Sequence, residues 1–307
     1  MAIQWFPGHM HKAGLEIKKI LPEIDLVIEV LDARIPFSSA NPMLSKLRGD
    51  KPCIKLLNKT ELADPVLTQI WQSYLEQEQG VKTLAISAQQ HDCRQMILQL
   101  VMQMLPEKAR SVQKIQAMIM GIPNVGKSTL INTLAGRQIA KTGNEPAITK
   151  MQQRIKIDDV MVLHDTPGML WGNLENPGTG YRLAITGAIK ETAFENQDIA
   201  LYAAAYLMKQ YPETLKARFN LSQLAANETE QLAEMAVKRG CLRAGGVADL
   251  ERVSKIMLTE LRAGKLGPIT LETPEMMQQE LVILEQIRAE KAEKKARRKQ
   301  KNRTNGS

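Results

Sequence analysis

Short apolar runs separated by longer amphipathic segments dominate the chain from Leu26 to Asp165. The runs are rich in β-branched and aliphatic residues, and they read LVIEVL, CIKLL, TLAIS, AMIMG and VMVLHD. Buried runs of this length, with crossover segments between them, are typical of parallel strands that are covered on both faces. The pattern therefore predicts an α/β fold whose ligands bind where the strands end.

The pattern becomes helical after Gly168. Strand-like runs fade there, and a helical period of apolar positions takes over in residues 180–216, 227–239 and 247–263. Another helix-like stretch begins at Glu275, and its apolar positions end near Ile287. We expect three parts, which are an α/β domain over residues 1–172, a helical domain over residues 173–287 and a basic tail over residues 288–307.

Positive charge is concentrated in the predicted tail. The net charge of the 307-residue chain is +8, and residues 288–307 carry +7 of it through nine Lys and Arg against two Glu. Basic segments of this kind bind polyanions because binding releases condensed counterions, so nucleic acid is the natural partner. A disordered end that only improves solubility is the alternative.

The sequence gives no sign of a membrane segment. No apolar run reaches the roughly 20 residues that cross a bilayer, and the N-terminal residues lack the apolar core of a signal peptide. We therefore expect a cytoplasmic protein with no membrane partner. The three cysteines are far apart and show no metal-ligand spacing, so we expect reduced thiols with a structural role.

One octet carries the strongest chemical signal. Residues 121–128, GIPNVGKS, match the pattern GxxxxGK[ST], follow the strand-like run AMIM and open a helix-like segment. The backbone amides of such a loop bind phosphates at a helix N-terminus; Lys127 would reach the β- and γ-phosphates, and Ser128 would bind Mg²⁺. A glycine-rich turn without a ligand is the alternative. The predicted nucleotide contacts of this loop are Asn124, Val125, Gly126, Lys127, Ser128 and Thr129.

Two further segments are candidates for sensing the γ-phosphate. Residues 165–168, DTPG, follow an apolar run and resemble the DxxG turn, in which Asp165 would hold Mg²⁺ through water and the Gly168 amide would contact the γ-phosphate. Thr149 lies in a polar stretch where GTPases place their first switch, and it could close over Mg²⁺ and the γ-phosphate. An ordinary Pro-Gly turn and a solvent-facing threonine are the alternatives.

Two loops that precede the octet are candidates for base recognition. They are Asn58, Lys59, Thr60 and Glu61 after CIKLL, and Ile86, Ser87 and Ala88 at the end of TLAIS. In the usual GTPase order both would follow the phosphate loop, so the same sheet would be built from a circularly permuted chain. The guanine motif normally ends in Asp, and Glu61 offers a carboxylate with a longer reach, so guanine is favoured while strict selectivity stays open. A surface turn is the alternative.

Several separated pieces of sequence are together more specific than the octet. They are IQWFPGHM, LDARIPFSSANP, LLNK, GIPNVGKSTLIN, DTPG and the stretch from KRGCLRAGG through ELRAGKLGPITLE. With these pieces the chain resembles the circularly permuted ribosome biogenesis GTPase A family (YlqF/RbgA) over nearly its whole length. The resemblance implies a circularly permuted P-loop GTPase domain with a C-terminal helical domain. It also implies GTP hydrolysis coupled to late assembly of the large ribosomal subunit, with the helical domain and tail contacting ribosomal RNA.

The residue that places the attacking water is not evident from the motifs. Met169 follows the DTPG turn where many GTPases carry a glutamine. The resemblance nominates His9, in FPGHM, as a residue that helps to orient the water, and packing within the N-terminal segment is its alternative. A resemblance to GTPases that carry asparagine at this point of the phosphate loop further implies a bound K⁺ at Asn124, with a simple loop hydrogen bond as the alternative. The predicted catalytic set is therefore His9, Lys127, Thr149 and Gly168.

These observations together predict a GTPase that acts on a precursor of the large ribosomal subunit and binds its rRNA. Hydrolysis would time the release of the protein from that precursor. An RNA-binding assembly scaffold, whose nucleotide site tunes affinity without significant turnover, is the alternative that the missing glutamine favours. A GTPase that acts on the small subunit or on tRNA is a second alternative.

Overall fold

A six-stranded sheet forms the centre of the first part of the molecule. The computed structural model describes residues 8–88, 90, 92–140, 153–170 and 176–304. Within them the strand order is β3-β2-β1-β4-β6-β5, with β5 antiparallel to β6 and the other pairs parallel. The strands are β1 (Leu26–Asp32), β2 (Cys53–Asn58), β3 (Val81–Ala85), β4 (Ile115–Gly121), β5 (Gln153–Ile157) and β6 (Met161–Asp165). The predicted α/β class is confirmed.

The strand order also confirms the predicted permutation. β4, which leads into the glycine-rich octet, lies in the middle of the sheet between β1 and β6. Strands β1, β2 and β3 precede β4 in the chain, yet they extend the sheet outward on one side of it. A chain that began at β4 and returned to β1 after β6 would build the same sheet. Because the five parallel strands end at one edge, their loops converge there.

Helices cover both faces of this sheet. The helices are α1 (Gly8–Ile20), α2 (Pro42–Arg48), α3 (Pro65–Leu75), α4 (Cys93–Met104) and α6 (Lys127–Ala135). Leu26 and Ile28 of β1 are buried with α4 and α6, whereas Val27 between them is buried with α1 and α2. Trp71 of α3 packs on Leu31, which continues the face of Val27. Alternate residues of β1 thus supply two separate cores, as the two-residue period of a strand requires.

The shorter helical pieces lie in the connections. Pro106–Ala109 forms the short helix α5 in the connection between α4 and β4. Single 3₁₀ turns are formed by Leu21–Glu23, Thr60–Leu62, Glu191–Ala193 and Ala244–Gly246. Among the residues described, no helix is long and apolar enough to cross a membrane. The three cysteines are buried and form no disulfide, as expected.

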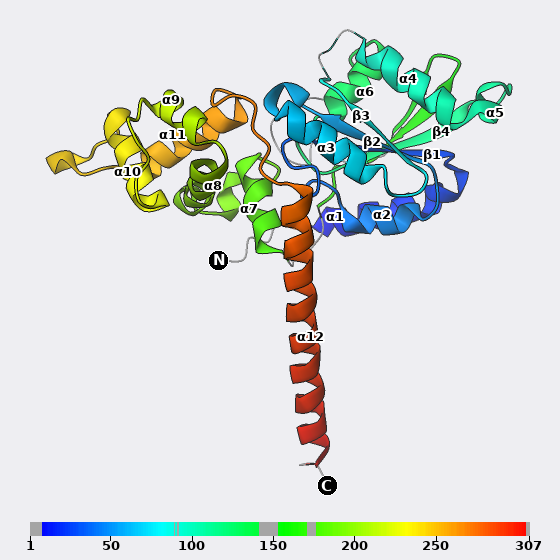
Figure 1. The fold of residues 1–307 in the computed structure, drawn as a ribbon. Coiled ribbons are helices and arrows are strands. Elements are labelled where there is room, and N and C mark those ends of the chain that lie inside the picture. Colours follow the sequence, from blue (N-terminus) through cyan, green and yellow to red (C-terminus); the bar gives the residue numbers. More distant parts are fainter. Residues whose placement is uncertain (1–7, 89, 91, 141–152, 171–175, 305–307) are drawn as a thin grey trace.

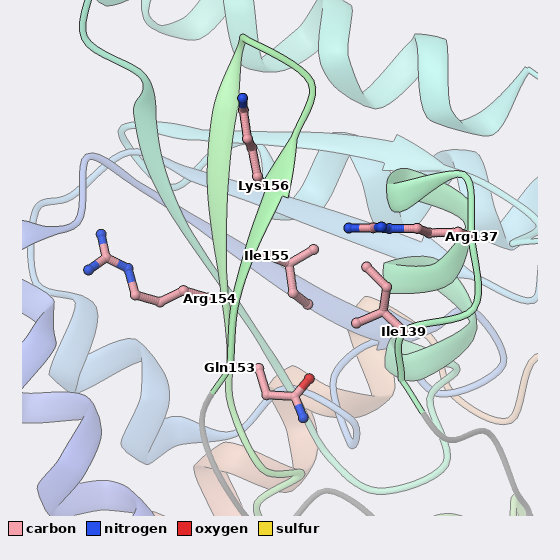
Figure 2. Close-up of a pocket in the computed structure, with 6 residues that line it drawn as sticks. All are labelled: Arg137, Ile139, Gln153, Arg154, Ile155 and Lys156. Atoms are coloured by element: carbon pink, nitrogen blue, oxygen red, sulfur yellow. The ribbon is translucent and has the colours of Figure 1, made fainter.

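The antiparallel edge strand β5 escaped the sequence analysis. Its residues read QRIKI, so only Ile155 and Ile157 contribute apolar side chains to the core. A hollow of about 530 Å³ lies beside it, where Arg137 extends toward the strand and Arg154 points away (Figure 2). Exposed charges on an edge strand oppose pairing with a second chain. The hollow is therefore a feature of the sheet edge, and none of the predicted nucleotide-site residues lines it.

The second part of the chain is helical. Its helices are α7 (Pro177–Ile185), α8 (Asn196–Gln210), α9 (Pro212–Phe219), α10 (Glu228–Lys238) and α11 (Leu250–Arg262). The helical stretch expected from the periodicity over residues 180–216 is three helices, α7, α8 and α9. The second break lies at Pro212, which cannot continue α8 and begins α9 instead. Helix α12 (Pro274–Thr304) leaves both parts and projects away from them, carrying the basic residues at its far end (Figure 1).

Residues 269–272 run from the helical part across the α/β part to α12, and we call them the strap. The backbone N–H of Ile269 donates to the carbonyl of Leu62 at 2.9 Å. The N–H of Leu271 donates to the carbonyl of Arg34 at 2.8 Å. The strap therefore binds two loops of the α/β part, one after β1 and one after β2.

A buried arginine fixes the strap. Arg182 of α7 is fully buried, lies 3.7 Å from the carboxylate of Glu272 in the strap and also pairs with Glu280 of α12. Glu272 in turn accepts a hydrogen bond from the backbone N–H of Ser38 at 2.9 Å. Burial raises the pKa of the Glu272 carboxyl, and the charge of Arg182 opposes this effect. One guanidinium thus connects α7, the strap and α12.

Removing that guanidinium tests how far the two parts depend on it. We expect Arg182→Leu to lower the free energy of unfolding by about 3 to 5 kcal/mol, because it leaves the buried Glu272 without its ion-pair partner. This substitution raises the pKa of Glu272 in the folded state further, so the folded protein binds a proton at Glu272 more tightly than the unfolded chain does. Stability is then kept at low pH and lost as pH rises through that pKa, so the deficit is larger at pH 8 than at pH 5.

Urea denaturation at both pH values measures the two deficits. Arg243→Leu is the matched control, because the Arg243 side chain is 62% exposed in its ion pair with Asp249, and its removal should cost within about 1 kcal/mol. Equal deficits for the two variants would contradict a structural role for Arg182.

Candidate functional site

The glycine-rich octet joins β4 to α6 at the edge where the parallel strands end. Gly126 has a φ of 93°, and a Cβ atom there would lie 2.3 Å from Nδ2 of Asn58. A Cβ on Gly121 would lie 2.8 Å from the carbonyl oxygen of Val30. We call residues 121–128 the phosphate loop. Both glycine positions exclude a side chain, which lets Val30 of β1 and Asn58 at the end of β2 approach this loop closely.

Lys127 and Asp165 form a buried ion pair beside this loop. The Lys127 ammonium donates to Oδ1 of Asp165, and the two side chains are 6% and 1% exposed. Burial lowers the pKa of Lys127 and raises that of Asp165, while in each case the charge of the partner opposes the effect. Ser128 follows Lys127 in the first turn of α6. The predicted phosphate-binding cation therefore lies next to two of the predicted metal ligands.

The DTPG turn packs directly on the phosphate loop. The Thr166 hydroxyl donates to the carbonyl of Ile119 at 2.9 Å, and the N–H of Met169 donates to the carbonyl of Gly121 at 3.1 Å. A Cβ on Gly168 would lie 3.2 Å from the nitrogen of Pro123, which is closer than ordinary contact. A shift of this turn would therefore press on the phosphate loop.

Asn58 connects both predicted base loops to the phosphate loop. Its Nδ2 donates to the carbonyl of Val125 at 2.7 Å, and its Oδ1 accepts from the N–H of Ala88 at 3.0 Å. The N–H of Thr60 donates to the carbonyl of Ile86 at 3.3 Å. Segments that are far apart in the chain thus meet at one buried amide.

Lys59 connects the same base loop to a residue that the motif analysis did not select. Its ammonium lies 2.9 Å from Oδ2 of Asp32 and 2.5 Å from the carbonyl oxygen of Asn124. Asp32 ends β1, is 2% exposed and also binds the guanidinium of Arg34 at 2.7 Å. A signal for Asp32 was present in the sequence, because the charged segment DAR directly follows an apolar run. Such a pattern is expected where a buried charge lies at the end of a strand.

Asn124 joins the phosphate loop to the helical part. It has a φ of 62°, and its Nδ2 donates to the carbonyl of Gly187, just after α7, at 2.7 Å. Arg262 of α11 binds the same turn, because its Nε donates a hydrogen bond to the carbonyl oxygen of Ile185 at 2.9 Å. The side-chain nitrogen of Asn124 therefore binds the phosphate loop to the turn that follows α7.

The other predicted site residues lie around this edge or outside the described structure. Glu61 is exposed in the 3₁₀ turn of the guanine motif, and Ser87 and Thr129 are half-buried. His9 falls in the first turn of α1, but its side chain lies outside the described residues. Thr149 lies outside them altogether.

Comparison with known proteins gives matches over nearly the whole chain. A family model for 50S ribosome-binding GTPases matches residues 116–235, which begin in β4. The ribosome biogenesis GTPase A of Priestia megaterium is 46% identical over 92% of this chain and all of its own length. The protein of the same name from Bacillus pumilus is 46% identical over 90% of this chain and all of its own length.

Solved structures with the same architecture carry nucleotides. GDP-bound TM YlqF matches with a TM-score of 0.60 and 27% identity, over 85% of this chain and 99% of that one. GNP-bound YlqF from Thermotoga maritima matches with a TM-score of 0.59 and 28% identity, over 86% of this chain and 99% of that one.

The contact between Gly126 and Asn58 can be tested by adding one methyl group. We expect Gly126→Ala to weaken GDP binding at least tenfold and to cost about 2 to 4 kcal/mol of stability, because the new Cβ must displace Asn58 as well as strain the backbone. Gly136→Ala is the matched control, since Gly136 has a φ of 65° but nothing within 4 Å of an added Cβ. Titration with fluorescent GDP and urea denaturation measure both effects. Equal behaviour of the two variants would remove the steric argument.

Proposed function

The chain belongs to the ribosome biogenesis GTPase A family, and from this premise we propose that it binds ribosomal RNA and couples GTP hydrolysis to late assembly of the large ribosomal subunit. It is a GTPase of ribosome biogenesis, as its relatives are named, so the scaffold without turnover is not favoured. The observation that carries the finer proposal is the hydrogen bond from Asn124 to Gly187, because it joins the phosphate loop to the helical part.

The phosphate end of the site would be organised by Lys127. In our proposal the β- and γ-phosphates compete with Asp165 for the Lys127 ammonium, and the amides that open α6 donate to the same phosphates. The Gly168 amide would meet the γ-phosphate, so the DTPG turn would report whether that phosphate is present. Because this turn is hydrogen-bonded to Gly121, its position and that of the phosphate loop would change together.

GTP hydrolysis in this family has the usual dependence on Mg²⁺, and the donors here suit that ion. The Ser128 hydroxyl and the Asp165 carboxylate provide oxygen ligands, which Mg²⁺ prefers, and Asp165 is 1% exposed beside the phosphate loop. Thr149 would complete the set. Bound there, Mg²⁺ would neutralise charge on the phosphates. K⁺ held by Asn124 would add to that neutralisation.

Water positioning would fall to a residue outside the DTPG turn. The Met169 side chain is fully buried in the core that includes α1 and α2, and its thioether cannot orient an attacking water. His9, at the start of α1, would supply the imidazole that does so from outside the phosphate loop. The base end would be read by residues 58–61, with the Glu61 carboxylate accepting from the guanine ring.

RNA would contact the helical part and α12. The basic residues of the tail continue α12, which projects from the body of the molecule (Figure 1). Its charge of +7 over residues 288–307 would release counterions from RNA phosphates. The strap and Asn124 both join the helical part to the nucleotide site. The bound nucleotide would therefore influence the affinity for RNA.

Turnover of GTP with purified ribosomal subunits tests this function. We expect large subunits to stimulate hydrolysis of GTP but not of ATP, with a higher rate in K⁺ than in Na⁺. His9→Ala should lower the stimulated rate of hydrolysis by about 10²- to 10⁴-fold and retain GDP binding, because only the positioning of water is removed. His11→Ala, in the same helix, is the matched control and should keep the rate. Tight GTP binding without stimulated turnover would instead favour the scaffold. Stimulation by small subunits alone would favour a GTPase that acts on the small subunit.

The link from Asn124 to the helical part predicts RNA affinity that depends on the nucleotide. We expect the affinity for large-subunit rRNA to differ roughly 5-fold or more between the GDP-bound and GTP-analogue-bound states, as is typical of coupled sites. Asn124→Ala should reduce the difference between the GDP-bound and GTP-analogue-bound affinities for rRNA. Asn196→Ala is the control, since Asn196 bonds to Glu251 within the helical part. Filter binding at fixed salt measures the affinities, and identical values in the wild type would end the coupling proposal.

A further inference from the structure

The carboxylate of Asp32 is held in one orientation by its own turn. Arg34 donates to it from the backbone N–H at 3.1 Å, from Nε at 2.9 Å and from Nη2 at 2.7 Å. The N–H of Asp32 donates to the Ser39 hydroxyl at 3.0 Å. The strap holds the same turn from outside through the bond from Leu271 to the carbonyl of Arg34. The orientation of the carboxylate therefore does not depend on Lys59.

Lys59 reaches this carboxylate from a strained backbone. Its φ of 64° and ψ of 38° place it in the left-handed region, which a residue with a side chain adopts only when surrounding contacts impose it. Its ammonium spans the gap between Oδ2 of Asp32 and the carbonyl oxygen of Asn124. The side chain thus connects the base loop to the phosphate loop, and Asp32 is the charged group that receives it.

We propose that Asp32 is a positioning residue for nucleotide binding, which holds the charged Lys59 side chain across to the phosphate loop and so keeps the base loop in its binding conformation. The inference deepens the proposed function and rests on its assignment of residues 58–61 to the base. Asp32 acts through Lys59 rather than on the nucleotide. The charged sequence DAR after β1 thereby gains a role that the phosphate and base motifs do not describe.

The charges around Lys59 make this role testable by substitution. The Lys59 ammonium lies 2.9 Å from Oδ2 of Asp32 and near the cation of Arg34, which is bound to the same carboxylate. Replacing Asp32 with Asn removes the main stabilising charge and leaves the Arg34 cation facing the ammonium. The Lys59 side chain should then be held less firmly against the carbonyl oxygen of Asn124, so the affinity for GDP should fall. This loss should require Lys59, because Asp32 acts through it.

The experiment is titration of the full chain with fluorescent GDP at pH 7.5, as a double-mutant cycle with Lys59→Met. We expect Asp32→Asn to bind GDP at least tenfold more weakly than the wild type. In the Lys59→Met background the same substitution should change the affinity by less than about threefold, because the group through which Asp32 acts is gone. Glu29→Gln is the matched control, because Glu29 is also on β1 and 4% exposed but faces Lys55 and Arg48. It should bind GDP like the wild type.

Each outcome decides the inference. Wild-type affinity in Asp32→Asn, or the same tenfold loss with and without Lys59, would overturn it, because a purely structural role of Asp32 would not depend on Lys59. If the stranded Arg34 prevents Asp32→Asn from folding, the double variant Asp32→Asn with Arg34→Met removes that cation, and full GDP affinity in it would overturn the inference equally. Lys127→Ala separates the two proposals, since GDP binding that is absent in the wild type or unaffected by Lys127→Ala would instead refute the nucleotide site itself.

Discussion

The side chain of Asn58 occupies the space that a Cβ on residue 126 would need, and the rest of the site depends on that contact. It requires glycine at position 126, and it lets one amide bind the phosphate loop on one side and the second base loop on the other. The three segments come from β2, β3 and β4, which the chain visits in an unusual order. Chain order matters little to such a site, because the parallel strands deliver their loops to the same edge whichever strand is made first.

The helical part is connected to both ends of this site by different means. At the phosphate end, the amide of Asn124 reaches Gly187 directly. At the base end, the strap bonds to Leu62 in the turn of the guanine motif and to Arg34 beside Asp32. The strap contact is the more deeply buried, since Glu272 and Arg182 are fully inaccessible to solvent. The phosphate end is thus joined to the helical part through the side chain of a single residue, whereas the base end is joined through the buried strap.

The sequence was sufficient for the parts of the fold that repeat a simple pattern. Five strands were evident because each is rich in apolar residues, and the octet was evident because its glycines and lysine have fixed spacing. The edge strand β5 was missed because one side of it faces solvent and its residues alternate weakly. Arg182 and Glu272 were missed for a different reason. Charged residues at those positions look like surface residues until the fold brings them together, 90 positions apart along the chain and 3.7 Å apart in space.

Asp32 and Asp165 show a symmetry that no single motif contains. β1 and β6 flank β4, and each ends in an aspartate that pairs with a lysine. Asp32 pairs with Lys59 in the loop after β2, and Asp165 pairs with Lys127 at the start of α6. The two pairs differ in what supports them. Asp32 has a second cation in Arg34, whose charge together with that of Lys59 outweighs burial and holds the pKa of Asp32 well below its usual range. Asp165 has Lys127 alone, and burial keeps its pKa raised. In the nucleotide site that we propose, phosphates at α6 would therefore meet the pair with the single cation, and Lys127 would change partners while Lys59 remains in place.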